Sequence, residues 1–92
     1  MNIEFYRNEI DRIDRELVRL FCARMEAAEN IGRIKKQNGL PVENAARESA
    51  VLDTAAGCAP DRYKQSVAEL YKAIFAISKS YQSEMPEDAE HE

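Results

Sequence analysis

Residues that cross-link or interrupt a fold are scarce in this chain of 92 residues, which has two cysteines, three glycines, three prolines, one histidine and no tryptophan. A disulfide scaffold needs more cysteine, and collagen-like or low-complexity chains need more glycine and proline. Apolar residues make up 45% of the chain and charged residues 33%, a balance that excludes a disordered protein. The length is enough for one domain with a small core.

Long apolar runs are absent as well. No run approaches the ~18 residues of a membrane-spanning helix, and acidic residues interrupt the N-terminal stretch where an export signal would be apolar. Cys22 and Cys58 have no histidine at metal-ligand spacing, so we interpret both as reduced thiols of a cytoplasmic protein. The formal net charge of −4 argues against nucleic acid as the main partner. No metal site or glycine-rich phosphate loop is indicated.

A single helical pattern covers the first 38 residues. Its apolar side chains recur at alternating steps of three and four, which is the spacing of heptad a and d positions. Asn2 is a typical N-cap, and Gly39 followed by Pro41 is a typical helix stop. We therefore predict one helix over residues 3–38. Its a and d positions are Ile3, Tyr6, Ile10, Ile13, Leu17, Leu20, Arg24, Ala27, Ile31 and Ile34.

The length of that helix predicts a second chain. At ~1.5 Å per residue the helix measures ~54 Å, whereas a compact chain of this size has a radius of gyration of only ~12 Å. The helix must therefore project beyond any globule that its own chain can form. Its apolar positions need a cover, and a symmetric homodimer is the simplest way to supply one.

Two further helices are predicted in the rest of the chain. The second covers residues 44–56, with Asn44 or its neighbour as the N-cap. Pro60 is typical of a first helical position, and from Tyr63 to Tyr81 the apolar residues again follow heptad spacing. The fold class is therefore all-α, with one long helix, one short helix and one of medium length.

The end of the chain differs from the helical part. Residues 84–92 are acidic and have no apolar periodicity, which predicts a disordered tail. The domain itself is expected to cover residues 1–83.

Arg24 stands at an a/d position where an apolar residue is expected. A buried cation needs an anionic partner, which could be an acid on another helix, unless the side chain reaches solvent at the edge of the interface. Lys35 lies ~16 Å further along the same face, so the two cations could also hold a small anion between them. Arg7 lies ~25 Å from Arg24. It could serve the same ligand only from the partner chain of an antiparallel dimer, or else be a solvated surface residue.

Four more polar residues border the apolar positions. Arg47 and Glu48 lie in the first turn of the second predicted helix, near its free backbone N–H groups and positive dipole end. Capping and dipole complementarity are the more ordinary explanation of an acid at Glu48. Ser78 and Gln82 stand four residues apart on the third predicted helix, where polar residues are commonly the solvated edge of an apolar stripe. Each of these pairs is a weak signal by itself.

In combination these residues resemble the all-α (type II) chorismate mutases. The N-terminal stretch is similar to the family's opening pattern of an arginine followed by Ile-Asp-x-Ile-Asp, and later segments follow at the family's spacing. The resemblance covers roughly residues 3–83. The matching segments are Arg7 with residues 10–14, Arg24-Met25, residues 31–35, residues 39–42, Arg47-Glu48, and Ser78 with Gln82.

The resemblance implies a homodimer of three-helix subunits whose long helices intertwine and form two equivalent active sites. Each site would combine residues of one chain with Arg7 of the other. Three residues are implied to be catalytic: Lys35 and Gln82 would donate to an ether oxygen of the substrate, and Glu48 would accept from a ring hydroxyl. The implied substrate-binding residues are Arg7, Arg24, Asn44, Arg47 and Ser78. Asn44 departs from the family pattern, because several relatives have Asp at this position.

The implied reaction is the conversion of the dianion chorismate to prephenate, a step of phenylalanine and tyrosine biosynthesis. It is an intramolecular Claisen rearrangement without proton transfer or covalent intermediate, so no cofactor is expected. The protein has to hold a compact conformer of the substrate and to stabilise the charge that develops as the C–O bond breaks. Arginine suits the carboxylates, because its forked N–H groups match carboxylate geometry.

Two other kinds of function remain open at this point. Isochorismate-pyruvate lyases and 4-amino-4-deoxychorismate mutases share the scaffold and its cations, although Glu48 as an acceptor for a C4 hydroxyl favours chorismate. A non-catalytic helical dimerisation module would account for both heptad patterns, but it would leave Arg24 unexplained. Since the chain has no length for an attached dehydratase, dehydrogenase or synthase domain, we expect a monofunctional protein.

Overall fold

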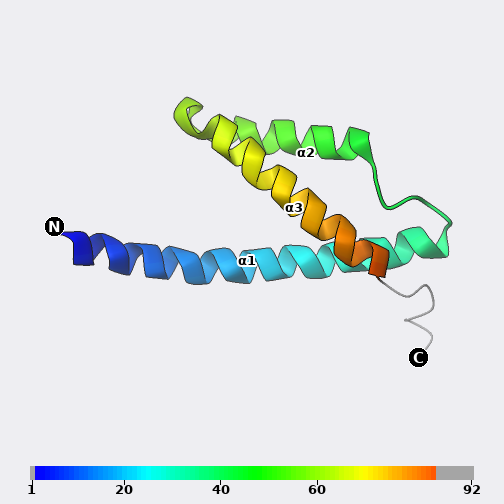
Figure 1. Cartoon of the computed structure of the whole chain (residues 1–92), viewed down its shortest axis with the longest axis horizontal. Coiled ribbons are helices and arrows are strands. Elements are labelled where there is room, and N and C mark those ends of the chain that lie inside the picture. Colours follow the sequence, from blue (N-terminus) through cyan, green and yellow to red (C-terminus); the bar gives the residue numbers. More distant parts are fainter. Residues whose placement is uncertain (1, 85–92) are drawn as a thin grey trace.

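A computed structural model describes residues 2–84 of the chain as three α-helices and one short 3₁₀-helix (Figure 1). The elements are α1 (Ile3–Gln37), α2 (Ala45–Gly57), η1 (Asp61–Tyr63) and α3 (Lys64–Glu84). No strand occurs within residues 2–84, so the predicted all-α fold of one long, one short and one medium helix is confirmed. In Figure 1 α1 is a single long rod, and α3 crosses its C-terminal part while α2 lies on the other side of α3.

The ends of the helices follow the predicted caps. The extended backbone of Asn2 lets its side-chain oxygen accept a hydrogen bond from the Phe5 N–H at 3.0 Å, and Asn44 caps α2 by accepting from the Arg47 N–H at 3.0 Å. α1 ends at Gln37, one residue before the predicted end. Gly39 has a φ of 65°, a left-handed conformation that glycine adopts without the steric cost of a Cβ.

The third predicted helix begins differently from the prediction. Pro60 precedes a 3₁₀ turn instead of standing at the first position of an α-helix, and α3 begins only at Lys64. Glu84, the first residue of the predicted tail, is the last residue of α3. The remainder of that tail, residues 85–92, lies outside the described residues.

The described chain is elongated, as the length of the first helix predicted. Its radius of gyration is 16.6 Å and its extents are 54 × 30 × 16 Å, against ~12 Å for the radius of gyration of a compact chain. Met25 and Ala28 are buried apolar residues on α1, whereas Ile3 and Leu17 in its N-terminal half are 66% and 57% exposed. The N-terminal half of α1 therefore has an uncovered apolar face.

The packing of the three helices depends on α3, which contacts both α1 and α2. α1 and α3 approach closely at Gly32, which is buried against Gln82. α2 has no fully buried residue and rests on half-buried side chains such as Val51 and Leu52. Among the described residues no helix has the length and apolar character needed to cross a membrane.

Candidate functional site

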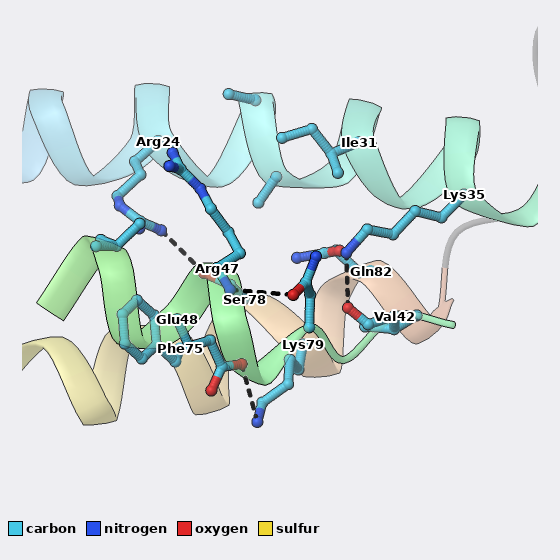
Figure 2. A pocket seen from close by; sticks show the side chains of 14 residues that line it. Arg24, Ile31, Lys35, Val42, Arg47, Glu48, Phe75, Ser78, Lys79 and Gln82 are labelled. Carbon is cyan, nitrogen blue, oxygen red and sulfur yellow. Dashed lines mark hydrogen bonds and ion pairs between the residues drawn. The ribbon is translucent and has the colours of Figure 1, made fainter. Parts of the chain in front are cut away.

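A pocket of about 320 Å³ lies between the C-terminal half of α1, the start of α2 and the C-terminal half of α3 (Figure 2). Seven of the eight residues singled out in the sequence line it, and they come from all three helices and the loop before α2. These residues are Arg24, Lys35, Asn44, Arg47, Glu48, Ser78 and Gln82. The fold therefore brings together side chains that are up to 58 positions apart in the sequence, from Arg24 to Gln82.

Arg24 is held by a hydroxyl and two aromatic rings. Its Nη1 donates to Ser78 Oγ at 3.4 Å, and its guanidinium carbon lies 5.8 Å and 6.0 Å from the ring centres of Tyr71 and Phe75. Among the ion pairs of the described residues none includes Arg24, so the acid partner considered from the sequence is absent there. Aromatic faces attract a cation but leave its N–H donors available for an anion.

Lys35 points into the pocket from α1. Its Nζ donates to the backbone carbonyl of Val42 at 2.7 Å, as Figure 2 shows. An ammonium group has three N–H donors, so this bond positions the side chain and leaves donors for a ligand. The next residue, Lys36, donates to the Ser83 carbonyl at 2.6 Å and thereby joins the last turn of α1 to the last turn of α3.

Ser78 and Gln82 are the buried polar residues of α3, at 4% and 8% exposure. They are one helical turn apart and therefore lie on the same face. The Oε1 atom of Gln82 is buried and has no hydrogen-bond partner among the described residues. A buried acceptor costs free energy when it is unpaired and can be satisfied only by a donor, whereas the amide N–H groups of Gln82 are the donors that a ligand oxygen could use.

The N-cap and first turn of α2 contribute three residues to the pocket. The side-chain oxygen of Asn44 accepts from the Arg47 N–H, a bond that an Asp would form equally well. The departure from the family pattern therefore preserves the cap. Glu48 is half-buried, and its Oε2 lies 3.2 Å from the Nζ of Lys79.

Arg7 is the one predicted site residue that the fold keeps away from this pocket. It lies near the N-terminus of α1, its side chain is 67% exposed, and its Nη1 pairs with the Glu4 carboxylate at 3.0 Å. Within one chain it does not line the pocket.

Lys79 lines the pocket and was missed in the sequence analysis. Its Nζ lies 2.9 Å from a carboxylate oxygen of Glu43 and 3.2 Å from one of Glu48. Hydrogen bonds to Glu43 and Glu48 raise the pKa of Lys79, and the hydrogen bond from Lys79 lowers the pKa of Glu43. Its place beside Ser78 was the one feature of the sequence that could have pointed to Lys79.

The aromatic partners of Arg24 were missed as well. Tyr71 and Phe75 look in the sequence like ordinary apolar positions.

The charges around the pocket are suited to an anion. Four basic side chains and a single carboxylate line it, although the whole chain has a net charge of −4. Within residues 2–84 no three metal-ligating side chains lie together. The basic residues are Arg24, Lys35, Arg47 and Lys79, and the carboxylate is Glu48. Such a site can bind a small molecule with carboxylates and hydrogen-bond its neutral oxygens.

Comparisons with known proteins identify two relatives of this chain. The chain is 29% identical over 84 residues to a bifunctional chorismate mutase/prephenate dehydratase of Aquifex aeolicus. The matched segment covers 86% of this chain and 23% of that protein. It is 48% identical over 46 residues to a T-protein of Haemophilus influenzae. That segment covers 50% of this chain and 12% of the T-protein. The chain thus spans less than a quarter of the length of these relatives. No solved structure matches the chain.

The family described as chorismate mutase type II matches residues 6–83. The match includes every residue that lines the pocket, and it also includes Arg7 at the opposite end of α1. The chain therefore belongs to the chorismate mutase type II family.

Proposed function

We propose that this protein is a chorismate mutase, which rearranges chorismate to prephenate on the route to phenylalanine and tyrosine. The observation that carries the proposal is the convergence of seven polar residues from three helices on one basic pocket. A pericyclic rearrangement needs no nucleophile and no proton donor. It needs a site that holds the reactive conformer and stabilises the charge that develops on the ether oxygen.

In this proposal the two ends of the pocket have different tasks. Arg24 binds a substrate carboxylate, and Ser78 adds a hydrogen bond to the same group. Lys35 and Gln82 donate to the ether oxygen as it gains negative charge. The buried position of Gln82 supports this role, because a donor that is already oriented stabilises developing charge more than water does.

The start of α2 binds the ring side of the substrate. Glu48 accepts a hydrogen bond from the ring hydroxyl, and Arg47 supports both Glu48 and the carboxylates. Asn44 holds the first turn of α2 in place through its cap. The Asn44 side chain is therefore important for the position of Arg47 and Glu48, a task that needs only the cap and not the Asp of several relatives.

The complete site requires a homodimer in which Arg7 comes from the partner chain. The exposed apolar face of α1 supports this arrangement. A groove of about 470 Å³ between α1 and α3 does so too, because apart from Arg24 its lining is apolar or aromatic. We propose that a second copy fills this groove, with the long helices antiparallel and intertwined. The groove is lined by Leu17, Val18, Leu20, Phe21, Arg24, Leu70, Tyr71, Ala73, Ile74 and Ile77.

We place this activity in the cytoplasm. Cys22 and Cys58 are both free and exposed, and free thiols are typical of reducing compartments.

The test is to measure turnover of chorismate, isochorismate and 4-amino-4-deoxychorismate side by side. Formation of prephenate from chorismate alone is the expected result, because in this proposal Glu48 accepts from a hydroxyl at C4. Release of pyruvate from isochorismate would instead identify a lyase. A non-catalytic dimerisation module would turn over none of the three, and it would not bind a bicyclic dicarboxylate that mimics the transition state.

A further inference from the structure

Lys79 is a pocket residue to which neither the family resemblance nor the proposed function gives a task. We infer that Lys79 is a positioning residue, which joins α3 to the start of α2 and sets the place of the Glu48 carboxylate in the pocket. The inference rests on the proposed function for its effect on catalysis, and on the geometry alone for its effect on α2.

The Lys79 ammonium binds two carboxylates at once. It lies 2.9 Å from Oε1 of Glu43 and 3.2 Å from Oε2 of Glu48, and an ammonium has donors enough for both. In Figure 2 Lys79 and Glu48 meet at the side of the pocket that faces away from α1. The side chains of Lys79 and Glu48 are 32% and 29% exposed, against 69% for Glu43. The Glu48 contact is therefore the more sheltered of the two.

The two carboxylates stand on either side of the N-cap of α2. Glu43 directly precedes Asn44, and Glu48 follows it by four residues. Lys79 thus holds the loop and the first turn of α2 with one side chain. On the α1 side, Lys35 holds the same loop through the Val42 carbonyl.

This link is important because, apart from the Asn44 cap and the bond from Lys35 to Val42, the packing of α2 does little to fix its start. No residue of α2 is fully buried, and the half-buried apolar residues Val51, Leu52 and Ala55 lie beyond the first turn. A small rotation of that turn would move the Glu48 carboxylate relative to the buried pair Ser78 and Gln82. Lys79 lies on α3 directly after Ser78 and three residues before Gln82. Its contact with Glu48 therefore fixes the Glu48 carboxylate relative to the helix that carries both residues.

A second use of Lys79 would be direct contact with a substrate carboxylate. In the structure its ammonium is already bound to two carboxylates, whereas Arg24 has no anionic partner among the described residues. The two uses differ in one measurable respect. If Lys79 acts by placing Glu48, substitution of Lys79 no longer lowers activity once Glu48 has been replaced. If Lys79 binds the substrate directly, its substitution still lowers activity in that background.

The catalytic test compares Lys79→Met with Lys72→Met, which removes the same charge from an exposed site two turns earlier on α3. We expect Lys79→Met to lower kcat/KM about tenfold, since misplacement by about 1 Å can cost up to ~100-fold. Lys72→Met should stay within about twofold of the parent, and Lys79→Arg should regain most of the loss because it keeps the charge. In a Glu48→Gln background, Lys79→Met should lower kcat/KM by less than about a further twofold.

A substrate-free readout separates this inference from the proposed function. Hydrogen exchange of the backbone N–H groups in the first turn of α2 should become several-fold faster in Lys79→Met and stay unchanged in Lys72→Met. If the parent does not convert chorismate, the proposed function fails, and the exchange rates alone decide whether Lys79 holds α2. Unchanged kcat/KM in Lys79→Met, an undiminished loss in the Glu48→Gln background, or unchanged exchange would each overturn the inference.

Discussion

Gly32 on α1 is packed directly against Gln82 on α3, so closely that a Cβ at position 32 would lie 2.8 Å from the Cβ of Gln82 and 2.9 Å from its Cα. Contacts that short do not occur between packed carbon atoms, and part of the obstacle is backbone. The absence of a side chain at Gly32 therefore allows α3 to bring Gln82 to the same side of α1 as Lys35, three residues further on.

Gly32→Ala should separate the two helices at this point. We expect a loss of about 1–3 kcal/mol in the free energy of unfolding, as for overpacked cores, together with a fall in kcat/KM because Gln82 moves. Denaturant unfolding and chorismate turnover measure the two effects. Gly57→Ala is the matched control, since nothing lies within 4 Å of its Cβ position and alanine favours a helix. Equal behaviour of the two variants would contradict the close approach.

The proposed shared site predicts complementation between two inactive variants. Arg7→Ala and Arg24→Ala should each be nearly inactive, because each removes a carboxylate ligand from both sites. After subunit exchange, a mixed dimer has one site that combines the intact Arg24 of one chain with the intact Arg7 of the other. Random mixing should restore about a quarter of the parent activity. Absence of recovery, with exchange verified by mass spectrometry, would rule out the shared site.

Arg24→Ala should impair catalysis far more than folding. Loss of one preorganised donor costs ~3–4 kcal/mol of transition-state stabilisation, about 10²–10³-fold in kcat/KM. The fold should persist, because the variant leaves no unpaired charge beside Tyr71 and Phe75. Arg19→Ala is the control, an exposed arginine on the same helix whose ion pair within residues 2–84 is with Glu16. If the helical content of Arg24→Ala fell in parallel with its activity, Arg24 would be structural.

Gln82→Glu should make the activity depend on pH. The amide of Gln82 donates at every ordinary pH, whereas a carboxyl donates only when it is protonated. Burial would raise the pKa of the new carboxyl and Lys35 would lower it, but the direction of the profile is the same in either case. Activity should be poor at neutral pH and recover as pH falls. The parent and an exposed control, Gln65→Glu, should have comparatively flat profiles, and a flat profile for Gln82→Glu would contradict the donor role.

The ion pair of Glu43 with Lys79 predicts how stability depends on pH. Its hydrogen bond with Lys79 lowers the pKa of Glu43 below its ordinary value of 4.5, so the folded state binds the proton less readily than the unfolded state. The stabilisation is present above pH 4.5 and is lost as pH falls through the lowered pKa. The gap in unfolding free energy between the parent and Glu43→Gln should therefore narrow below pH 4.5. A gap that is constant from pH 3 to pH 7 would contradict this.

The helices of this protein could be predicted from the sequence because their causes are local. Heptad spacing and the caps at Asn2 and Asn44 act over at most four residues, so α1 and α2 begin and end within one residue of the predicted bounds. The length of α1 likewise required an elongated chain. The start of α3 differed, because Pro at a first helical position is compatible with a 3₁₀ turn as well as with an α-helix, and η1 precedes α3 here.

The surroundings of the site residues that contact another helix were decided by the tertiary structure. Arg24 lies between aromatic rings instead of beside an acid, and Lys79 joins α3 to two carboxylates near the start of α2. Both contacts depend on how α3 crosses its neighbours, which is set by the close approach at Gly32 and by side chains distant in sequence. Periodicity shows which face of a helix is apolar, but it carries no information about which residues of another helix that face will meet.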